Sequence, residues 1–364
     1  MEKLISLLRF SLGISPEFEH KLTADEWTEM LNIAHRQALV GVLFCGVRRL
    51  GGQYAPPLPL MLQWTAEAER ICGMNHAFNQ KAKALTGMFA AENRQSFILK
   101  GQANARLYPE PLSRQPGDID IYVSGGKKSV LNMLVEKGMM EKDAFVSYHH
   151  AHLHNDSDDI TVEVHFRPSS GVFYPWGNKK LQNFLDSRIS NISLCDDGFY
   201  IPDMPFALIM QLAHIQKHFM GSGIGLRQIM DYYYLLCNAS QEHRQTVAQL
   251  LKPFSLIPFA GGLMWLIKYL FDIDESLMLC QPDEGVGRKI SNEIFHSGNF
   301  GWYSGFYNES FLKRYFRQRL RVMKLFFTFP KEMFWGRMSA YKFFVQTIPL
   351  RIRYRKLSLK DVDL

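Results

Sequence analysis

The feature that most constrains this 364-residue sequence is residues 117–123, a short segment in which polar and apolar residues alternate. Side chains two positions apart share one face of a β-strand, so Asp118 and Asp120 point to one side, and Ile119 and Ile121 point into a core. Two carboxylates at this spacing repel each other unless a cation lies between them. Because both ligands are oxygens, the segment predicts a magnesium site, with manganese as the alternative.

A second alternating segment, residues 160–167, supplies a third carboxylate. Glu163 and His165 lie on its polar face. If this strand lies beside the first, Glu163 joins Asp118 and Asp120, and three carboxylates can hold one or two divalent ions against a triphosphate. A polar residue on a half-exposed strand needs no function, so Glu163 also has a structural explanation, and His165 is interpreted as a neighbour.

A lysine and a glycine precede the aspartates at a predicted strand-to-helix turn. Gly101 would let backbone amides face phosphate at the N-terminus of a helix over residues 102–107, with Gln102 as its first residue. Lys100 and Arg114 could neutralise the charge of a triphosphate. An ordinary turn and solvated basic side chains are the simpler explanations.

Together these residues resemble a known family. The segment FILKG at residues 97–101, followed by GDIDIYV and later by VEVHF, resembles the nucleotidyltransferase superfamily that includes DNA polymerase beta. Within it the chain is most similar to the bacterial group called uncharacterised nucleotidyltransferases, over roughly residues 85–235. The resemblance implies transfer of a nucleoside monophosphate from a nucleoside triphosphate to an acceptor, with Asp118, Asp120 and Glu163 as catalytic metal ligands.

The turn departs from the pattern of that family. Gln102 stands where the superfamily usually has serine or glycine, and 15 residues separate it from Asp118, a longer interval than is common. The missing small side chain supports an alternative function, a noncatalytic module on a degenerate nucleotidyltransferase fold that binds nucleotide, nucleic acid or protein.

Histidines form two groups. His214 and His218 have a spacing that can bind zinc, but HIQKH lacks the glutamate of a zinc protease, and the resemblance instead implies that they approach the nucleotide or the acceptor. A following helix carries Arg227 and Asp231, for which an i,i+4 pair is the simplest explanation. A denser group occupies residues 149–154 and predicts either a metal site, with the histidines at 150, 152 and 154 on one face, or solvated residues of an edge strand.

The order of elements predicts an α+β fold. Residues 1–93 have helical periodicity and are predicted to form an N-terminal helical cover. Residues 94–200 carry the strands, including a hairpin of segments 145–154 and 159–166, and predict a small mixed β-sheet as the nucleotidyltransferase core. Residues 201–364 return to helix and form a C-terminal helical domain.

Amino-acid composition indicates a protein with a substantial core and without a disulfide framework, a secretion signal or a membrane span. A hydrophobic fraction of 47% supports a substantial core, and five scattered cysteines favour a reducing cytoplasm over a disulfide framework. The first residues predict an amphipathic helix rather than a secretion signal. The longest apolar stretch, residues 255–267, is shorter than the roughly 20 residues of a membrane span, so none is predicted.

The basic charge is concentrated in a tail, residues 313–356. This tail holds 13 Lys or Arg, 11 aromatic residues and one acid, Glu332, in a chain whose formal net charge is +7. It could hold nucleic acid through phosphate contacts and stacking, or rest on anionic lipid. Helices that pack their aromatic residues inward are the third possibility, and the large number of aromatic residues favours such a cap.

Overall fold

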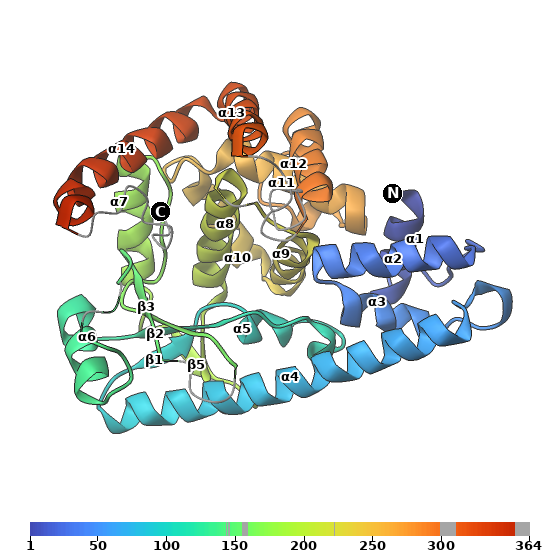
Figure 1. Cartoon of the computed structure of the whole chain (residues 1–364), viewed down its shortest axis with the longest axis horizontal. Coiled ribbons are helices and arrows are strands. Elements are labelled where there is room, and N and C mark those ends of the chain that lie inside the picture. Colours follow the sequence, from blue (N-terminus) through green and yellow to red (C-terminus); the bar gives the residue numbers. More distant parts are fainter. Residues whose placement is uncertain (143, 145, 155–158, 222, 299–310, 354–364) are drawn as a thin grey trace.

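The computed structural model describes residues 1–142, 144, 146–154, 159–221, 223–298 and 311–353 (Figure 1). The polar turn predicted at residues 155–158 and the last residues of the basic tail lie outside the described part. Among the described residues, none of the helices has the length and apolar character needed to cross a membrane.

A four-stranded mixed sheet lies at the centre of residues 94–200. Its strands are β1 (Ser96–Ile98), β2 (Ile119–Val123), β4 (Val162–His165) and β3 (His150–His152), in that spatial order. The two central strands, β2 and β4, are parallel, and each edge strand is antiparallel to its neighbour. The predicted α+β class with a small mixed sheet is confirmed.

The two faces of the sheet differ as the alternation predicts. Ile119, Ile121 and Val164 belong to a buried cluster with Phe78 and Phe89 of α4 (Leu58–Ala91). The short helix α6 (Gly126–Glu136) adds to the same cluster. The opposite face carries the polar residues of β2 and β4, so the core holds one side of the sheet and leaves the other for a site.

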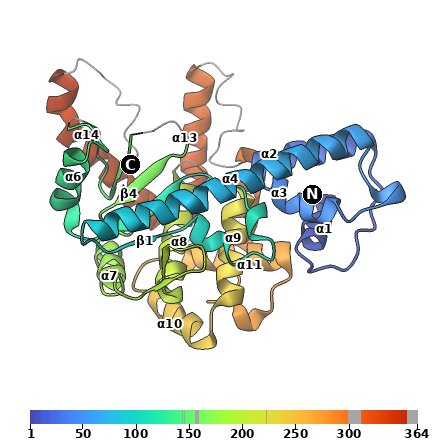
Figure 2. The same cartoon turned by 90° about the horizontal axis from the view of Figure 1, so that it is seen from below.

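The N-terminal helices separate into two groups. Helix α4 covers the sheet and runs across the molecule from the side of α6 to the side of α1 (Figure 2). By contrast, α1 (Glu2–Ser11), α2 (Ala24–Gln37) and α3 (Val40–Val47) share their core with the C-terminal helices. The continuous helical periodicity around residues 27–49 is interrupted at Ala38, whose φ of 55° is left-handed, and this separates α2 from α3.

The C-terminal part is a helical layer on the site side of the sheet. It contains α7 to α14, and its bounds are α7 (Pro175–Asp186), α8 (Met204–Met220), α9 (Leu226–Asn238), α10 (Gln241–Leu251), α11 (Ile257–Phe271), α12 (Glu284–Ser297), α13 (Phe311–Thr328) and α14 (Pro330–Arg353). A small hairpin of β5 (Ile192–Leu194) and β6 (Tyr200–Pro202) connects α7 to α8. The division at residues 93 and 200 stays a prediction.

Candidate functional site

One cavity of about 370 Å³ lies between the sheet and α8. It is lined by the three carboxylates that the sequence predicted as metal ligands. In the parallel pair of β2 and β4, Asp120 lies directly opposite Glu163. Lys100 follows β1, contacts Asp120, and has its Nζ 3.7 Å from Oδ1 of Asp118. The predicted adjacency of the two strands is confirmed, and the three acids surround one lysine.

The two aspartates differ in exposure, although the alternation predicted that both face solvent. The Asp118 side chain is 40% exposed, whereas that of Asp120 is 1% exposed. Burial by itself raises the pKa of Asp120, but the charge of Lys100 and a hydrogen bond with His165 outweigh it and lower that pKa. Burial opposes the charge on Lys100 too, and the neighbouring carboxylates raise its pKa.

His165 was expected to be only a neighbour of the site. It lies between two of the carboxylates and is part of the site. Its Nε2 is 3.0 Å from Oδ1 of Asp120 and 3.3 Å from Oε2 of Glu163. Burial works against the imidazolium, yet the two carboxylates raise the pKa of His165 to about 9. Burial also opposes the charge on Glu163, but the hydrogen bond and charge of His165 lower the pKa of Glu163 to about 2. Lys100 and His165 thus balance the acids.

The donor set fits a divalent cation. Ligand atoms of Asp120, Glu163 and His165 all lie within 4.8 Å of one another. The buried Nδ1 of His165 has no hydrogen-bond partner in the described part of the chain. Carboxylates suit magnesium or manganese, and His165 would extend the set toward transition metals after loss of its proton.

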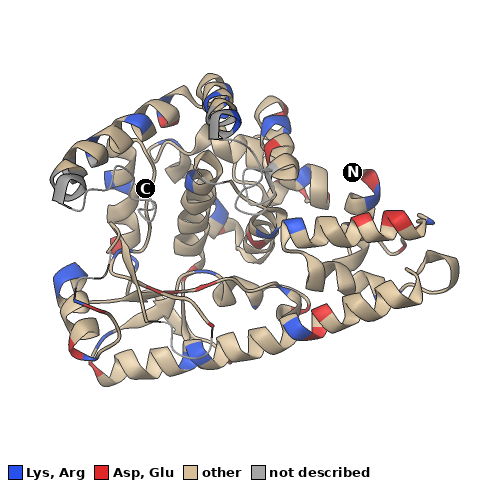
Figure 3. Cartoon of the chain, viewed as in Figure 1, with Lys and Arg blue, Asp and Glu red and all other residues tan. Residues whose placement is uncertain are grey.

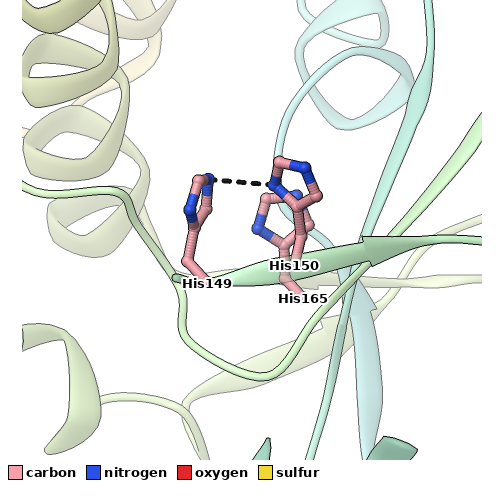
Figure 4. Close-up of side chains that lie close together, drawn as sticks. All are labelled: His149, His150 and His165. Carbon is pink, nitrogen blue, oxygen red and sulfur yellow. Dashed lines mark hydrogen bonds between the residues drawn. The ribbon is translucent and has the colours of Figure 1, made fainter. Parts of the chain in front are cut away.

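A histidine cluster extends this site across β3 and β4 (Figure 4). Nδ1 of His150 lies 3.1 Å from Nε2 of His149, and the His149 ring centroid is 5.2 Å from that of His165. His150 and His152 both approach Glu163, at 3.4 and 3.9 Å, as their shared face predicts. Burial lowers the pKa of His150 to about 4 and that of His149 further.

His154 does not join this cluster. Its side chain is 53% exposed and its Nε2 lies 3.5 Å from Glu141. The strand predicted over residues 145–154 is regular only over His150–His152, with Phe145 outside the described residues, and His149 precedes the strand. The backbone there turns around Ser147, whose hydroxyl accepts hydrogen bonds from the amides of His149 and His150. This turn brings His149 into the site instead of His154.

Helix α8 closes the cavity from the opposite side. His214 and His218 line it, with their ring centroids 4.2 Å apart. Burial lowers the pKa of both rings, to about 4 for His218. Sequence reasoning missed Lys217, although it stands between these histidines in the helix. Its Nζ donates to the carbonyl of Ser170 at 2.9 Å, and burial lowers its pKa to about 8.

The Lys-Gly turn differs from the predicted phosphate cradle. Gly101 has a φ of 65°, and a Cβ there would meet the Asp118 carbonyl oxygen at 3.4 Å. The following helix, α5 (Gln102–Ala105), is a single turn, and its amides at 104 and 105 donate to the Gly101 carbonyl. The side chain of Gln102 is buried against Asn75 and Asn79 rather than in the cavity. The turn therefore positions Lys100 and Asp118 and does not offer a helix N-terminus to phosphate.

Arg114 also lies outside the cavity. Its guanidinium donates to both carboxylate oxygens of Asp231 at 2.7 and 2.8 Å, and Tyr108 donates to the same carboxylate. Arg227 donates to the backbone carbonyls of Gln115 and Pro116. The i,i+4 pair expected for Arg227 and Asp231 is thus replaced by contacts to the segment before β2. These residues anchor that segment to α9.

A second cavity of about 540 Å³ adjoins the first. Both are lined by Ser170, Lys217 and Gly221, and the second extends to α13 and α14. Its walls combine apolar residues such as Phe173 with basic residues such as Arg337.

The site is thus a cavity between a mixed sheet, with acids on its adjacent central strands, and covering helices. The family model described as uncharacterised nucleotidyltransferase matches residues 23–272, and the chain belongs to this family. Among solved structures, the chain is similar to an antigenic nucleotidyltransferase-like protein from Paracoccidioides brasiliensis. That match has 12% identity and a TM-score of 0.35, and it covers 58% of this chain and 96% of the other. No curated protein matches the sequence.

Proposed function

We propose that this protein is a metal-dependent nucleotidyltransferase that moves a nucleoside monophosphate from a nucleoside triphosphate to an acceptor hydroxyl or phosphate. The observation that carries the proposal is the pairing of Asp120 with Glu163 on parallel strands, with Asp118 beside them, in one cavity. Membership of the nucleotidyltransferase family supports the reaction class. A cytoplasmic location, where nucleoside triphosphates are available, fits this activity.

In the proposed reaction an acceptor oxygen attacks the α-phosphorus. The bond from that phosphorus to the bridging oxygen breaks, and pyrophosphate leaves with the electron pair. Glu163 or Asp120 takes the proton of the acceptor, because both face the cavity and their lowered pKa values keep them unprotonated. Magnesium or manganese held by Asp118, Asp120 and Glu163 would supply charge neutralisation for the leaving group and a lower acceptor pKa.

The remaining cavity residues bind and orient the nucleotide. Lys100 balances the carboxylates in the free protein and lies close enough to contact a bound phosphate. His214 and His218 present two adjacent, uncharged rings, tilted by 48° to each other, on the opposite wall, which suits contact with a base or sugar. The acceptor would approach from the second cavity, past Lys217, because the two cavities share that residue.

The alternative, a noncatalytic binding module, is favoured by one observation. Lys100 and His165 already compensate two of the three carboxylate charges without an ion. A thermal-shift panel of nucleoside triphosphates, with and without magnesium, separates the two functions. The transferase requires that magnesium increase the stabilisation by nucleotide, and that Asp118→Asn remove this increase while Asp196→Asn, an exposed site elsewhere, keeps it. If nucleotide stabilises the protein equally with and without magnesium, the result supports the binding module.

A further inference from the structure

Two helices of the basic tail carry apolar stripes on their outer surfaces. On α13 the stripe consists of Phe316, Leu320, Met323 and Phe327, which are 63, 57, 55 and 81% exposed. Their spacing of three and four residues places them along one side of the helix. Phe327 is thus among the most exposed large apolar side chains of the described residues, on a helix that also has a buried face.

The buried face of α13 explains how the helix is attached. Leu325 of α13 is 7% exposed, and Phe329, which directly follows the helix, is 0% exposed. The ring of Phe329 lies 6.1 Å from those of Phe219 and Phe259. Arg321 pairs with Glu293 and donates to backbone carbonyls at the end of α8. These contacts attach α13 to the protein without using the residues of the outer stripe.

Helix α14 repeats this arrangement. Its outer stripe consists of Phe334, Met338, Tyr341, Val345 and Ile348, between 38 and 65% exposed, again at intervals of three and four residues. On the other side, Met333 is buried, and the buried Glu332 accepts a hydrogen bond from Ser255 at 3.2 Å. The only acid of the tail is thus turned into the protein, where it does not offset the surface charge.

Basic residues border both stripes. By helical spacing, Lys313 and Lys324 lie on one border of the α13 stripe and Arg319 on the other, and all three are exposed. Arg337 and Lys342 occupy the same positions beside the α14 stripe. Figure 3 shows Lys and Arg recurring along both helices. An apolar stripe between cationic borders is the pattern of a helix that lies in the interface of an anionic membrane.

We propose that α13 and α14 bind the protein to the surface of an anionic lipid bilayer, with the apolar stripes among the acyl chains and the basic borders at the headgroups. A second copy of the chain is disfavoured, because 13 basic residues and one acid on each tail would repel. Nucleic acid would use the positive charge but would leave most of the aliphatic residues in the stripes in water. The inference does not depend on the proposed transfer activity.

Vesicle flotation of the full chain tests this. Vesicles of phosphatidylcholine alone are compared with vesicles of equal parts phosphatidylcholine and phosphatidylglycerol. Binding is expected to the anionic vesicles, with a decrease at high salt. Lys313→Gln with Lys324→Gln should weaken it about fivefold per charge. The double variant Phe327→Gln with Phe334→Gln should weaken it by at least about tenfold.

A matched control is available on α4, which lies on the opposite side of the molecule from α14 (Figure 1). Leu58→Gln with Leu62→Gln changes two side chains that are 70 and 61% exposed, and binding should be unchanged. Melting temperatures confirm that each variant is folded. The proposal is overturned if the wild type ignores anionic vesicles, or if the stripe and control variants bind equally. Binding to a single-stranded RNA oligonucleotide without any binding to vesicles also overturns it, as does a stable dimer that excludes lipid.

Discussion

Arg114 and Asp231 form a two-point ion pair that connects the segment before β2 to helix α9. The two side chains are only 5 and 2% exposed, and Tyr108 donates to the same carboxylate. Arg114, which the sequence suggested as a residue for triphosphate binding, therefore stabilises the fold instead.

The first prediction concerns this pair. Asp231→Asn should lower the free energy of unfolding by about 3–5 kcal/mol, because the Arg114 charge remains buried without a partner. Urea denaturation measures this loss. Glu29→Gln removes the exposed partner of Arg36 and should cost less than about 1 kcal/mol. Equal losses in the two variants would contradict a structural role for Asp231.

Lys100 is predicted to stand in for a bound cation in the free protein. Lys100→Met should destabilise the chain by about 3 kcal/mol, because three carboxylates then repel one another. Magnesium should raise the melting temperature of this variant more than that of the wild type. Lys268→Met, which removes an exposed ion pair with Glu275, is the control. An equal magnesium effect in the variant and the wild type would argue against a cation site among these acids.

Nucleotide binding should depend on pH through Lys217. Burial lowers the pKa of this lysine to about 8, so it is charged at pH 7 and loses its charge as the pH rises through 8. Affinity for a nonhydrolysable nucleoside triphosphate with magnesium should therefore fall by up to about tenfold between about pH 7 and pH 9. Isothermal titration calorimetry measures this. Lys217→Arg, which keeps its charge, should reduce the dependence to the part that comes from His165, whose pKa is raised to about 9. A slope as steep in the arginine variant as in the wild type would rule Lys217 out.

The exposed stripe of α13 and the buried residue that directly follows this helix should differ in their effect on stability. Phe329→Ala removes a fully buried ring and should cost about 3–5 kcal/mol. Phe327→Ala, two residues away and 81% exposed, should change the free energy of unfolding by less than about 0.5 kcal/mol. Urea denaturation of both variants provides the comparison. A large loss for Phe327→Ala would mean that its ring is covered within the protein.

The two central strands could be predicted because polar and apolar residues alternate at Ile119–Ile121 of β2 and Val162–His165 of β4. Period-two alternation fixes which side of a strand faces the core, and so Asp120 and Glu163 could be expected on one face before their register was known. The burial of Asp120 could not be predicted, because it depends on Lys100, His165 and α8 coming from distant parts of the chain. Residue spacing also did not reveal that the turn at Ser147 brings His149 into the site.

Other expectations failed for reasons of tertiary structure. The partner of Asp231 is Arg114, 117 residues away, so a local i,i+4 rule favoured the wrong pair. The tail was expected to be a cap with its aromatic residues inward. Phe329 fulfils this expectation, but Phe316, Phe327 and Tyr341 are more than 60% exposed. Helical periodicity identifies an apolar stripe, but it does not say whether protein or solvent lies against it.

The most direct test of the proposed activity is transfer of label from nucleoside triphosphates labelled at the α-phosphate. The full chain is incubated with each nucleotide, magnesium and a pool of small-molecule and macromolecular acceptors. The account predicts magnesium-dependent incorporation of label with release of pyrophosphate, reduced about 100-fold or more by Asp118→Asn and unchanged by Asp196→Asn. Asp118 is the preferred position because its side chain is 40% exposed and the substitution should leave the fold intact. Incorporation that is undiminished in Asp118→Asn, or nucleotide binding without any magnesium-dependent transfer, would contradict it.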